Sequence, residues 1–162
     1  QALDAIREAH EEWGHLTGRY HAPLIEGYRM DDAEFSIVTL GSMTGAAKDA
    51  VDGARERGRR VGLVKVKTFR PFPAEAVAEA LRGHGAFGVV DRSVDFAWSC
   101  GPLYREVLTA LHGTTPAVPS QSFIGGLSGA DLTVEQFESV IETVRHLRDP
   151  GPRDTVWLNA QD

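Results

Sequence analysis

The stretch Phe35-Ser-Ile-Val-Thr-Leu-Gly-Ser-Met-Thr-Gly-Ala-Ala-Lys48 decides the fold class of this chain. Residues 35–40 are apolar enough for a buried strand, Gly41 supplies a tight turn, and the small residues after Thr44 begin a helix. A strand, a tight turn and a helix in this order open a doubly wound α/β domain. In such domains, ligands or partner chains gather at the carboxyl ends of the strands.

The same alternation of strands and helices continues on both sides of this unit. Gly58 and Pro150 end two of the helices, and Thr133 opens a capping box with Gln136. Pro119 restricts the last strand to a sheet edge or to its own first residues. Residues 155–158 are either a further strand or a tail that packs on a partner. We predict strands at 24–28, 35–40, 61–68, 86–91 and 118–124, and helices at 2–18, 44–57, 73–81, 102–111 and 134–147.

Length and charge limit the class of protein. The 162 residues suit one domain that needs no disulfide or metal to fold. The chain has 17 basic and 23 acidic residues and no basic cluster beyond residues 55–60, so we expect no nucleic-acid partner. No apolar run approaches the roughly 20 residues that cross a bilayer, so we expect no membrane partner.

The single cysteine, Cys100, excludes an internal disulfide, which fits a reducing compartment, and we expect a cytoplasmic location. The sequence does not start with Met, and we therefore expect an excised or processed piece of a longer protein.

The turn at Gly41-Ser-Met-Thr-Gly45 has two readings. Backbone N–H groups at the start of a helix attract anions, so the turn is either an anion site or purely structural. It lacks the glycine spacing of a dinucleotide-binding turn, and no acidic residue follows the strand at 61–68 to bind a ribose. A nucleotide triphosphate motif is also absent from the sequence.

No pattern in the sequence predicts a metal site or a catalytic residue. The six histidines lack metal-ligand spacing, and there is no second cysteine. Cys100 precedes a predicted helix, and the start of a helix lowers the pKa of a thiol, as a cysteine nucleophile requires. A small packing residue is the simpler interpretation of Cys100. The serines lack the spacing of a nucleophile elbow and suit turns and helix caps.

Two strand ends carry residues with an open interpretation. Phe69-Arg-Pro-Phe-Pro73 forms a rigid aromatic loop, in which Arg70 is either a docking residue or simply solvated. Asp91 and Arg92 end the strand at 86–91, and they form either a local ion pair or part of a site.

Five motifs follow one another along the chain: Tyr28 with Asp32-Ala-Glu34 and Val38-Thr-Leu-Gly-Ser42; Gly62-Leu-Val-Lys-Val66 with Phe69-Arg-Pro-Phe-Pro73; Val90-Asp-Arg-Ser93; Gly101-Pro-Leu-Tyr104; and Phe123-Ile-Gly-Gly-Leu127 before Asp131-Leu-Thr133. In this order they resemble the C-terminal domain of the alpha chain of pyruvate:ferredoxin oxidoreductases. Residues 95–100 depart from a more glycine-rich turn of that family, and Ser128-Gly-Ala130 stands where the family often has Gly-Gly-Arg. The first departure alters the crevice at the strand ends, and the second removes a basic contact.

The resemblance implies a transketolase C-terminal-like fold. This fold is a three-layer α/β/α sandwich with a five-stranded, mostly parallel sheet of order 1-3-2-4-5, in which the first strand is antiparallel. We expect an N-terminal helical extension at 1–22, the α/β domain at 23–150 and a tail at 151–162. Chain order reverses between the strands that end at Leu40 and Asp91, which predicts a crevice there. The candidate crevice or interface residues are Gly41, Ser42, Arg70, Asp91, Arg92 and Gly101.

The resemblance also implies a function in a larger enzyme. The family oxidises a 2-oxoacid such as pyruvate to an acyl-CoA with ferredoxin or flavodoxin as electron acceptor. Its thiamine diphosphate and iron-sulfur clusters lie outside this domain, so we expect this chain to bind no cofactor. It is expected to be a non-catalytic domain that serves assembly and active-site framing, with other domains or subunits of an oligomeric oxidoreductase as partners.

Two alternatives belong to other classes of function. The first is an autonomous domain that binds a small molecule or an anion in the crevice, and the second is a purely structural subunit-contact module. We expect Trp13 and Trp157 to be exposed for contact with another chain or domain, because the sequence assigns their apolar surface no partner.

Overall fold

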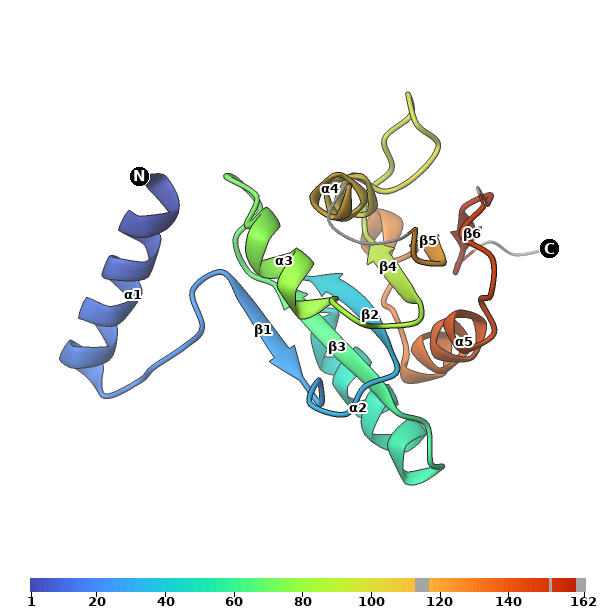
Figure 1. Ribbon diagram of the computed structural model, residues 1–162, viewed down its shortest axis with the longest axis horizontal. Helices are drawn as coiled ribbons and strands as arrows, with labels where there is room; N and C mark the ends of the chain where they lie inside the picture. Colours follow the sequence, from blue (N-terminus) through green and yellow to red (C-terminus); the bar gives the residue numbers. More distant parts are fainter. Residues whose placement is uncertain (113–116, 152, 160–162) are drawn as a thin grey trace.

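A mixed six-stranded sheet lies at the centre of the molecule. The computed structural model describes residues 1–112, 117–151 and 153–159. The sheet has the order β1-β3-β2-β4-β5-β6, in which β1 is antiparallel to β3 and the other pairs are parallel (Figure 1). The strands are β1 (Ile25–Tyr28), β2 (Phe35–Leu40), β3 (Val61–Val66), β4 (Phe87–Asp91), β5 (Ser120–Ile124) and β6 (Val156–Trp157).

Helices cover both faces of the sheet, which confirms the predicted three-layer α/β/α sandwich (Figure 1). One core cluster joins α2 (Thr44–Glu56) and α5 (Val134–Arg145) to one face, with Ile37, Val90 and Phe123 fully or almost fully buried. A second cluster joins α3 (Ala74–Ala80) and α4 (Pro102–Leu111) to the other face through Val64 and Phe87.

Local sequence signals place the ends of these helices. Pro102 occupies the first turn of α4, where its missing N–H costs no hydrogen bond. Gly58 follows α2 with a φ of 77°, a conformation that a side chain disfavours. The predicted capping box is confirmed, because the hydroxyl of Thr133 accepts the N–H of Gln136 at 3.3 Å and the Gln136 side chain accepts the N–H of Thr133 at 3.0 Å.

The carboxy-terminal segment adds a strand to the five that we predicted. Val156 pairs with Phe123 and Trp157 with Ile124, so β6 extends the sheet beyond β5. Of the two readings of residues 155–158, the strand is the one that the structure adopts. Pro119 therefore does not mark an edge strand; it lies just before β5, and its carbonyl oxygen accepts the N–H of Phe87 at 3.0 Å.

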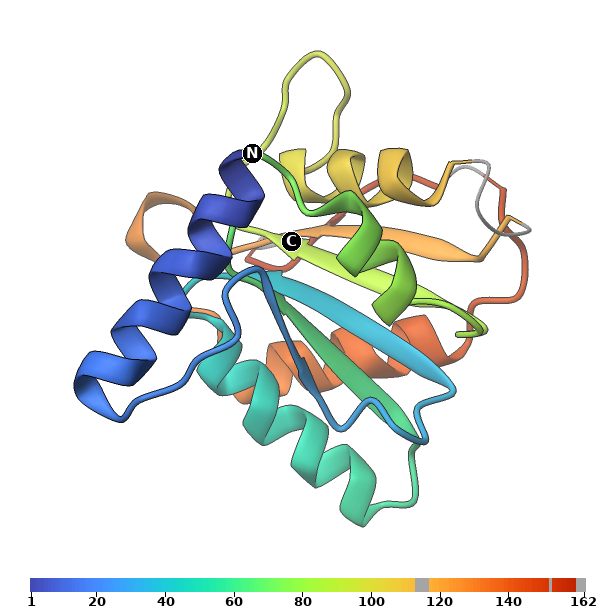
Figure 2. The same cartoon turned by 60° about the vertical axis from the view of Figure 1, so that its left-hand side comes forward.

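The first helix, α1 (Ala2–Thr17), stands beside the sandwich rather than in it (Figures 1 and 2). Gly14 is its one buried residue, because the ring of Tyr20 lies against it. Trp13 is 55% exposed and Trp157 is 47% exposed, in agreement with the exposure expected for both. None of the helices in the described residues has the length and apolarity needed to cross a bilayer.

Candidate functional site

The sheet brings four of the six candidate residues to one edge, and Gly101 joins them there. Because Val38 pairs with Val89, β2 and β4 end side by side, with Gly41 and Ser42 after β2 and Asp91 at the end of β4. We call Gly41, Ser42, Asp91, Arg92 and Gly101 the switch-point cluster, since the chain order reverses at this place in the sheet.

Asp91 holds the first turn of α4. Its carboxylate oxygens accept the N–H groups of Leu103 and Tyr104, each at 3.1 Å. These are two of the N–H groups that a helix leaves without a partner at its start. Burial raises the pKa of the Asp91 carboxyl to about 6, and the two N–H donors offset only part of that effect. Both oxygens of the Asp91 carboxylate therefore already accept hydrogen bonds from α4.

Gly101 is required by the position of Asp91. A Cβ atom at residue 101 would lie 1.9 Å from Oδ2 of Asp91 and 2.4 Å from its Cβ. The backbone N–H of Gly101 also points at the hydroxyl oxygen of Ser122, at 3.4 Å. Strand β4, helix α4 and strand β5 therefore meet at one glycine without room for a side chain.

Arg92 does not form the local ion pair with Asp91 that was one interpretation of it. Its guanidinium donates to the carbonyl oxygens of Gly126, at 3.1 and 3.2 Å, and Ala130, at 3.4 Å. Arg105 from α4 pairs with Asp95. Arg92 thus holds the loop 126–130, which contains the short 3-10 turn Leu127–Gly129 and has positive φ angles at residues 126, 128 and 129.

Hydrogen bonds among its own residues and with the end of β2 stabilise the glycine turn at residues 41–45. Gly41 has a φ of 82°, which favours glycine. The hydroxyl of Thr44 donates to the Gly41 carbonyl oxygen and lies 2.9 Å from the hydroxyl of Thr39. Ser42 is exposed and makes a backbone contact, in which its carbonyl oxygen accepts the N–H of Gly45. These contacts favour a structural turn over an anion site.

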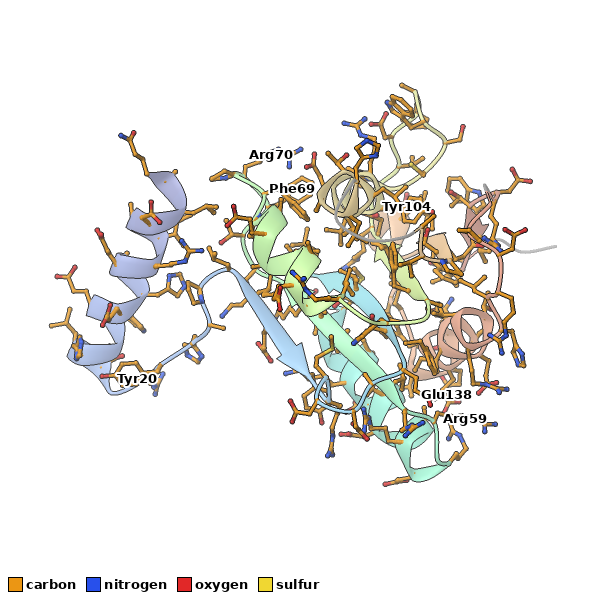
Figure 3. All side chains as sticks on the ribbon, viewed as in Figure 1. Tyr20, Arg59, Phe69, Arg70, Tyr104 and Glu138 are labelled. Carbon is orange, nitrogen blue, oxygen red and sulfur yellow. The ribbon has the colours of Figure 1, made fainter. Side chains whose placement is uncertain are left out.

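Arg70 lies on a different part of the molecule, where the loop 69–73 meets α4 (Figure 3). Its guanidinium stacks 4.1 Å from the centre of the Phe69 ring and pairs with Glu106 at 3.0 Å. Phe69 and Phe72 meet edge to face, so the loop is ordered by its own aromatic side chains. The side chain of Arg70 is nevertheless 59% exposed and remains accessible to a partner.

The residues described provide no metal site and no activated nucleophile. Within them, no group of three or more His, Cys, Asp or Glu side chains is placed to hold a metal ion. Burial, with the charges of Asp91 and Asp95 nearby, raises the pKa of the Cys100 thiol. That direction is opposite to the shift that activates a cysteine, so the packing interpretation of Cys100 is the better one.

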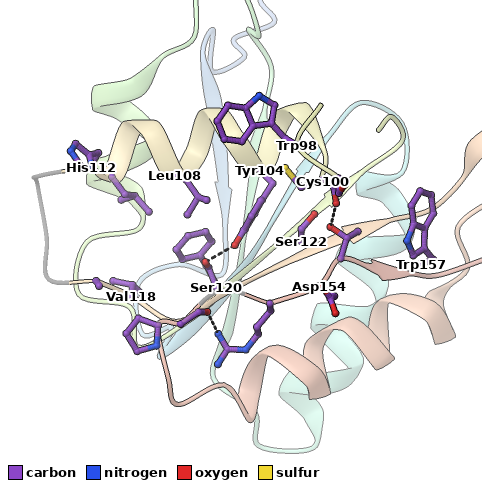
Figure 4. Close-up of a pocket in the computed structure, with 18 residues that line it drawn as sticks. Trp98, Cys100, Tyr104, Leu108, His112, Val118, Ser120, Ser122, Asp154 and Trp157 are labelled. Atoms are coloured by element: carbon purple, nitrogen blue, oxygen red, sulfur yellow. Dashed lines mark hydrogen bonds between the residues drawn. The ribbon is translucent and has the colours of Figure 1, made fainter. Parts of the chain in front are cut away.

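A cavity of about 940 Å³ lies beside α4, and sequence reasoning missed it (Figure 4). Its floor is Phe87, Ser120 and Ser122, and its walls come from α4, from the loop 98–100 and from Pro150, Gly151, residues 153–155 and Trp157. The available signal was the pair of serines at alternate positions of a buried strand, since such positions face the same side and normally carry larger apolar side chains. We call this space the α4 cavity.

Comparison with known proteins shows which family this chain resembles. The family described as pyruvate:ferredoxin oxidoreductase core domain II matches residues 33–137. The NADH-dependent phenylglyoxylate dehydrogenase subunit alpha of Aromatoleum evansii is 53% identical over 99% of this chain and 39% of its own length. The pyruvate synthase subunit PorA of Methanosarcina barkeri is 35% identical over 93% of this chain and 38% of its own length.

Solved structures support the fold. A 2-oxoglutarate:ferredoxin oxidoreductase from Magnetococcus marinus aligns with a TM-score of 0.58 and 18% identity over 85% of this chain and 22% of that chain. A split-gene transketolase aligns with a TM-score of 0.58 and 19% identity over 76% of this chain and 42% of that chain. The chain spans about two fifths of the length of the curated relatives given above.

Proposed function

Because this chain belongs to the pyruvate:ferredoxin oxidoreductase core domain II family, we propose that it frames the active site and joins the subunits of a 2-oxoacid oxidoreductase. The intact enzyme decarboxylates a 2-oxoacid, passes the electrons through iron-sulfur clusters to ferredoxin or flavodoxin, and forms an acyl-CoA. The observation that carries the proposal is the family match, which runs from before β2 into α5 and so includes the whole switch-point cluster.

The residues of this chain do not fit the cofactors of such an enzyme. An iron-sulfur cluster of the ferredoxin type takes four cysteine thiolates, and this chain contains one cysteine. The described residues also contain no group of three or more His, Cys, Asp or Glu side chains placed to hold a metal ion. We propose that the clusters, and thiamine diphosphate with them, are held by other parts of the enzyme.

The contacts at the strand ends suit a framing role. Asp91 fixes the start of α4, and Arg92 fixes the loop 126–130. Arg70 and Glu106 hold the loop 69–73 against the same helix. These contacts hold the start of α4 and two surface loops in defined positions, which is what a surface that borders another domain requires.

The autonomous alternative is less well supported than membership of a larger enzyme. The relatives align with this chain over only about two fifths of their length, and several of them are named as subunits. The proposed partners are thus the other domains and subunits of an oligomeric oxidoreductase. A cytoplasmic location belongs to the same proposal and rests on the single cysteine.

An anaerobic assay tests the proposal. The 162-residue chain alone is incubated with thiamine diphosphate, Mg²⁺, coenzyme A, a viologen acceptor and either pyruvate or phenylglyoxylate, the 2-oxoacids suggested by the relatives' names. We expect no turnover by the chain alone and turnover of at least one 2-oxoacid by the assembled enzyme. Turnover by the chain above a no-protein control would refute the non-catalytic role.

A further inference from the structure

The α4 cavity has the size and composition of a small-molecule site. Its volume of about 940 Å³ lies within the range of roughly 300 to 1,000 Å³ typical of ligand pockets. Apolar and aromatic side chains form much of its surface, among them Phe87, Trp98, Tyr104 and Leu108. A few polar groups are placed among them, which is the usual composition of such a site.

Hydroxyl groups supply hydrogen-bond donors at the floor of the cavity. The hydroxyls of Tyr104 and Ser120 lie 2.9 Å apart, and whichever of them donates to the other, the second O–H is left over (Figure 4). The Ser122 hydroxyl accepts the N–H of Gly101, which leaves its own O–H to donate. Burial raises the pKa of Tyr104, so its phenol stays protonated. The floor therefore presents two donors to a ligand.

The charge at the rim has the sign that an acceptor ligand needs. Arg153 lines the cavity and uses one guanidinium nitrogen for the carbonyl oxygen of Gly151, at 2.9 Å. Because a guanidinium has five N–H donors, the others remain available. Asp154 also lines the cavity, but its side chain points away from the rings of Tyr104 and Trp98 (Figure 4).

Flat side chains border the opening. Trp98 is 65% exposed, and the guanidinium of Arg105, which also pairs with Asp95, lies 5.6 Å from the centre of its ring. The exposed side of Leu108 and the ring of Trp157 complete the apolar rim. An aromatic pair in an offset or edge-to-face arrangement is stabilised beyond what its buried apolar area alone provides. A saturated ring contributes only its buried area.

We propose that the α4 cavity binds an aromatic carboxylic acid. The aromatic ring of the ligand lies against Trp98, Tyr104 and Leu108. Its carboxylate oxygens accept the O–H groups of Ser122 and of the Tyr104–Ser120 pair, and Arg153 supplies the positive charge. This site adjoins the switch-point cluster, because the Ser122 hydroxyl also accepts the N–H of Gly101, but it does not depend on the proposed enzymatic role.

A titration followed by ¹H–¹⁵N NMR tests the proposal with three probes. These are naphthalene-2-carboxylate, its neutral amide naphthalene-2-carboxamide, and the saturated acid cyclohexanecarboxylate. The 162-residue chain contains both core clusters and serves as the sample. We expect naphthalene-2-carboxylate to shift the signals of Trp98, Tyr104 and Ser122 and to bind more tightly than the other two probes.

Variants locate the binding. Ser122→Ala and Arg153→Gln each remove one ligand contact, so each should weaken naphthalene-2-carboxylate binding about threefold to tenfold. Trp13→Ala on the distant α1 is the matched control and should leave binding unchanged. Arg153 is exposed, so its variant remains informative if Ser122→Ala fails to fold.

Three results would overturn the proposal. The first is the absence of shifts at the cavity residues, and the second is equal binding of cyclohexanecarboxylate. The third is unchanged affinity in a folded Arg153→Gln variant.

Discussion

The side chains of the switch-point cluster bond within the chain, whereas the exposed apolar surfaces of this domain face outward. Asp91 accepts hydrogen bonds from α4, and Arg92 donates hydrogen bonds to the loop 126–130. Elsewhere, large apolar side chains face outward. In the described residues, one group lies on and next to α1 and consists of Trp13, Leu16 and Tyr20. The other group lies at and near the α4 cavity and consists of Phe96, Trp98, Leu108, Val156 and Trp157.

This difference separates the residues that shape the domain from those that remain available to other molecules. Doubly wound folds often bind ligands where the strand order reverses. Here, the polar groups of Asp91 and Arg92 at that place are engaged within the chain, and Gly101 leaves no room beside Asp91. We therefore expect the switch point to act as a structural joint that holds the neighbouring helix and loops in place, and we expect contact with other molecules at the exposed surfaces.

The largest expected effect on stability comes from adding a side chain at Gly101. In Gly101→Ala, the new Cβ would meet Oδ2, Cγ and Cβ of Asp91 at 1.9 to 2.4 Å. Because the clash includes the Cβ atom, no rotation of the Asp91 side chain relieves it. We expect a loss of about 3 kcal/mol or more in the free energy of unfolding, measured by urea titration.

Gly45→Ala is the matched control for this substitution. Gly45 is exposed within α2, and no atom lies within 4 Å of a Cβ built there. Alanine favours a helix over glycine, so we expect a gain of about 0.5 to 1 kcal/mol. Equal effects of the two substitutions would contradict the tight joint at Gly101.

The ionisation of Asp91 predicts a pH dependence of stability. Its pKa is raised from 3.8 to about 6 in the folded chain, so between those pH values the folded state holds a proton that the unfolded state releases. Stability from this group is therefore greatest below about pH 4 and falls as the pH rises to about 6. The shift corresponds to a loss on the order of 3 kcal/mol.

Asp91→Asn isolates this contribution, because asparagine does not titrate. Urea unfolding of both proteins at several pH values from 4 to 8 gives the difference in their stabilities. We expect the stability of the native chain relative to Asp91→Asn to fall between pH 4 and 6 and then to stay constant. A relative stability that rises with pH would mean that the N–H groups of α4 outweigh burial.

A smaller effect is expected from Arg92. Arg92→Ala removes the donors to two carbonyl oxygens of the loop 126–130 on an exposed side chain, so the domain should lose about 1 kcal/mol. In the assembled enzyme the loosened loop should reduce subunit affinity or turnover while the domain stays folded. Arg82→Ala, which removes an exposed pair with Glu79 at the end of α3, is the control for loop order. Unchanged affinity together with unchanged turnover would remove Arg92 from the framing residues.

The smallest effect on stability is expected on α1. Trp13 is exposed, so Trp13→Ala should change the unfolding free energy of the chain alone by less than about 0.5 kcal/mol. In the assembled enzyme, the same substitution should weaken subunit affinity measured by analytical ultracentrifugation. A marked loss of stability in the chain alone would place Trp13 in the fold instead.

The strand and helix order followed from local patterns, and the long-range contacts did not. Gly41, Gly58 and the capping box at Thr133 act within a few residues, so their sequence signals are specific. Arg92 bonds to a carbonyl oxygen 34 positions away, and backbone carbonyls have no sequence signature. The α4 cavity was missed for a related reason, since it forms only where Ser120 and Ser122 meet α4 and the returning residues 153–157.

Hydrogen–deuterium exchange of the chain alone and in the assembled enzyme tests the division between joint and contact surface most directly. Peptides from β2 and β4 through the start of α4 should already be protected in the chain alone and should change little on assembly, because their contacts are internal. Peptides from α1 should gain protection on assembly. Protection gained at the switch-point cluster, with α1 unchanged, would contradict the account.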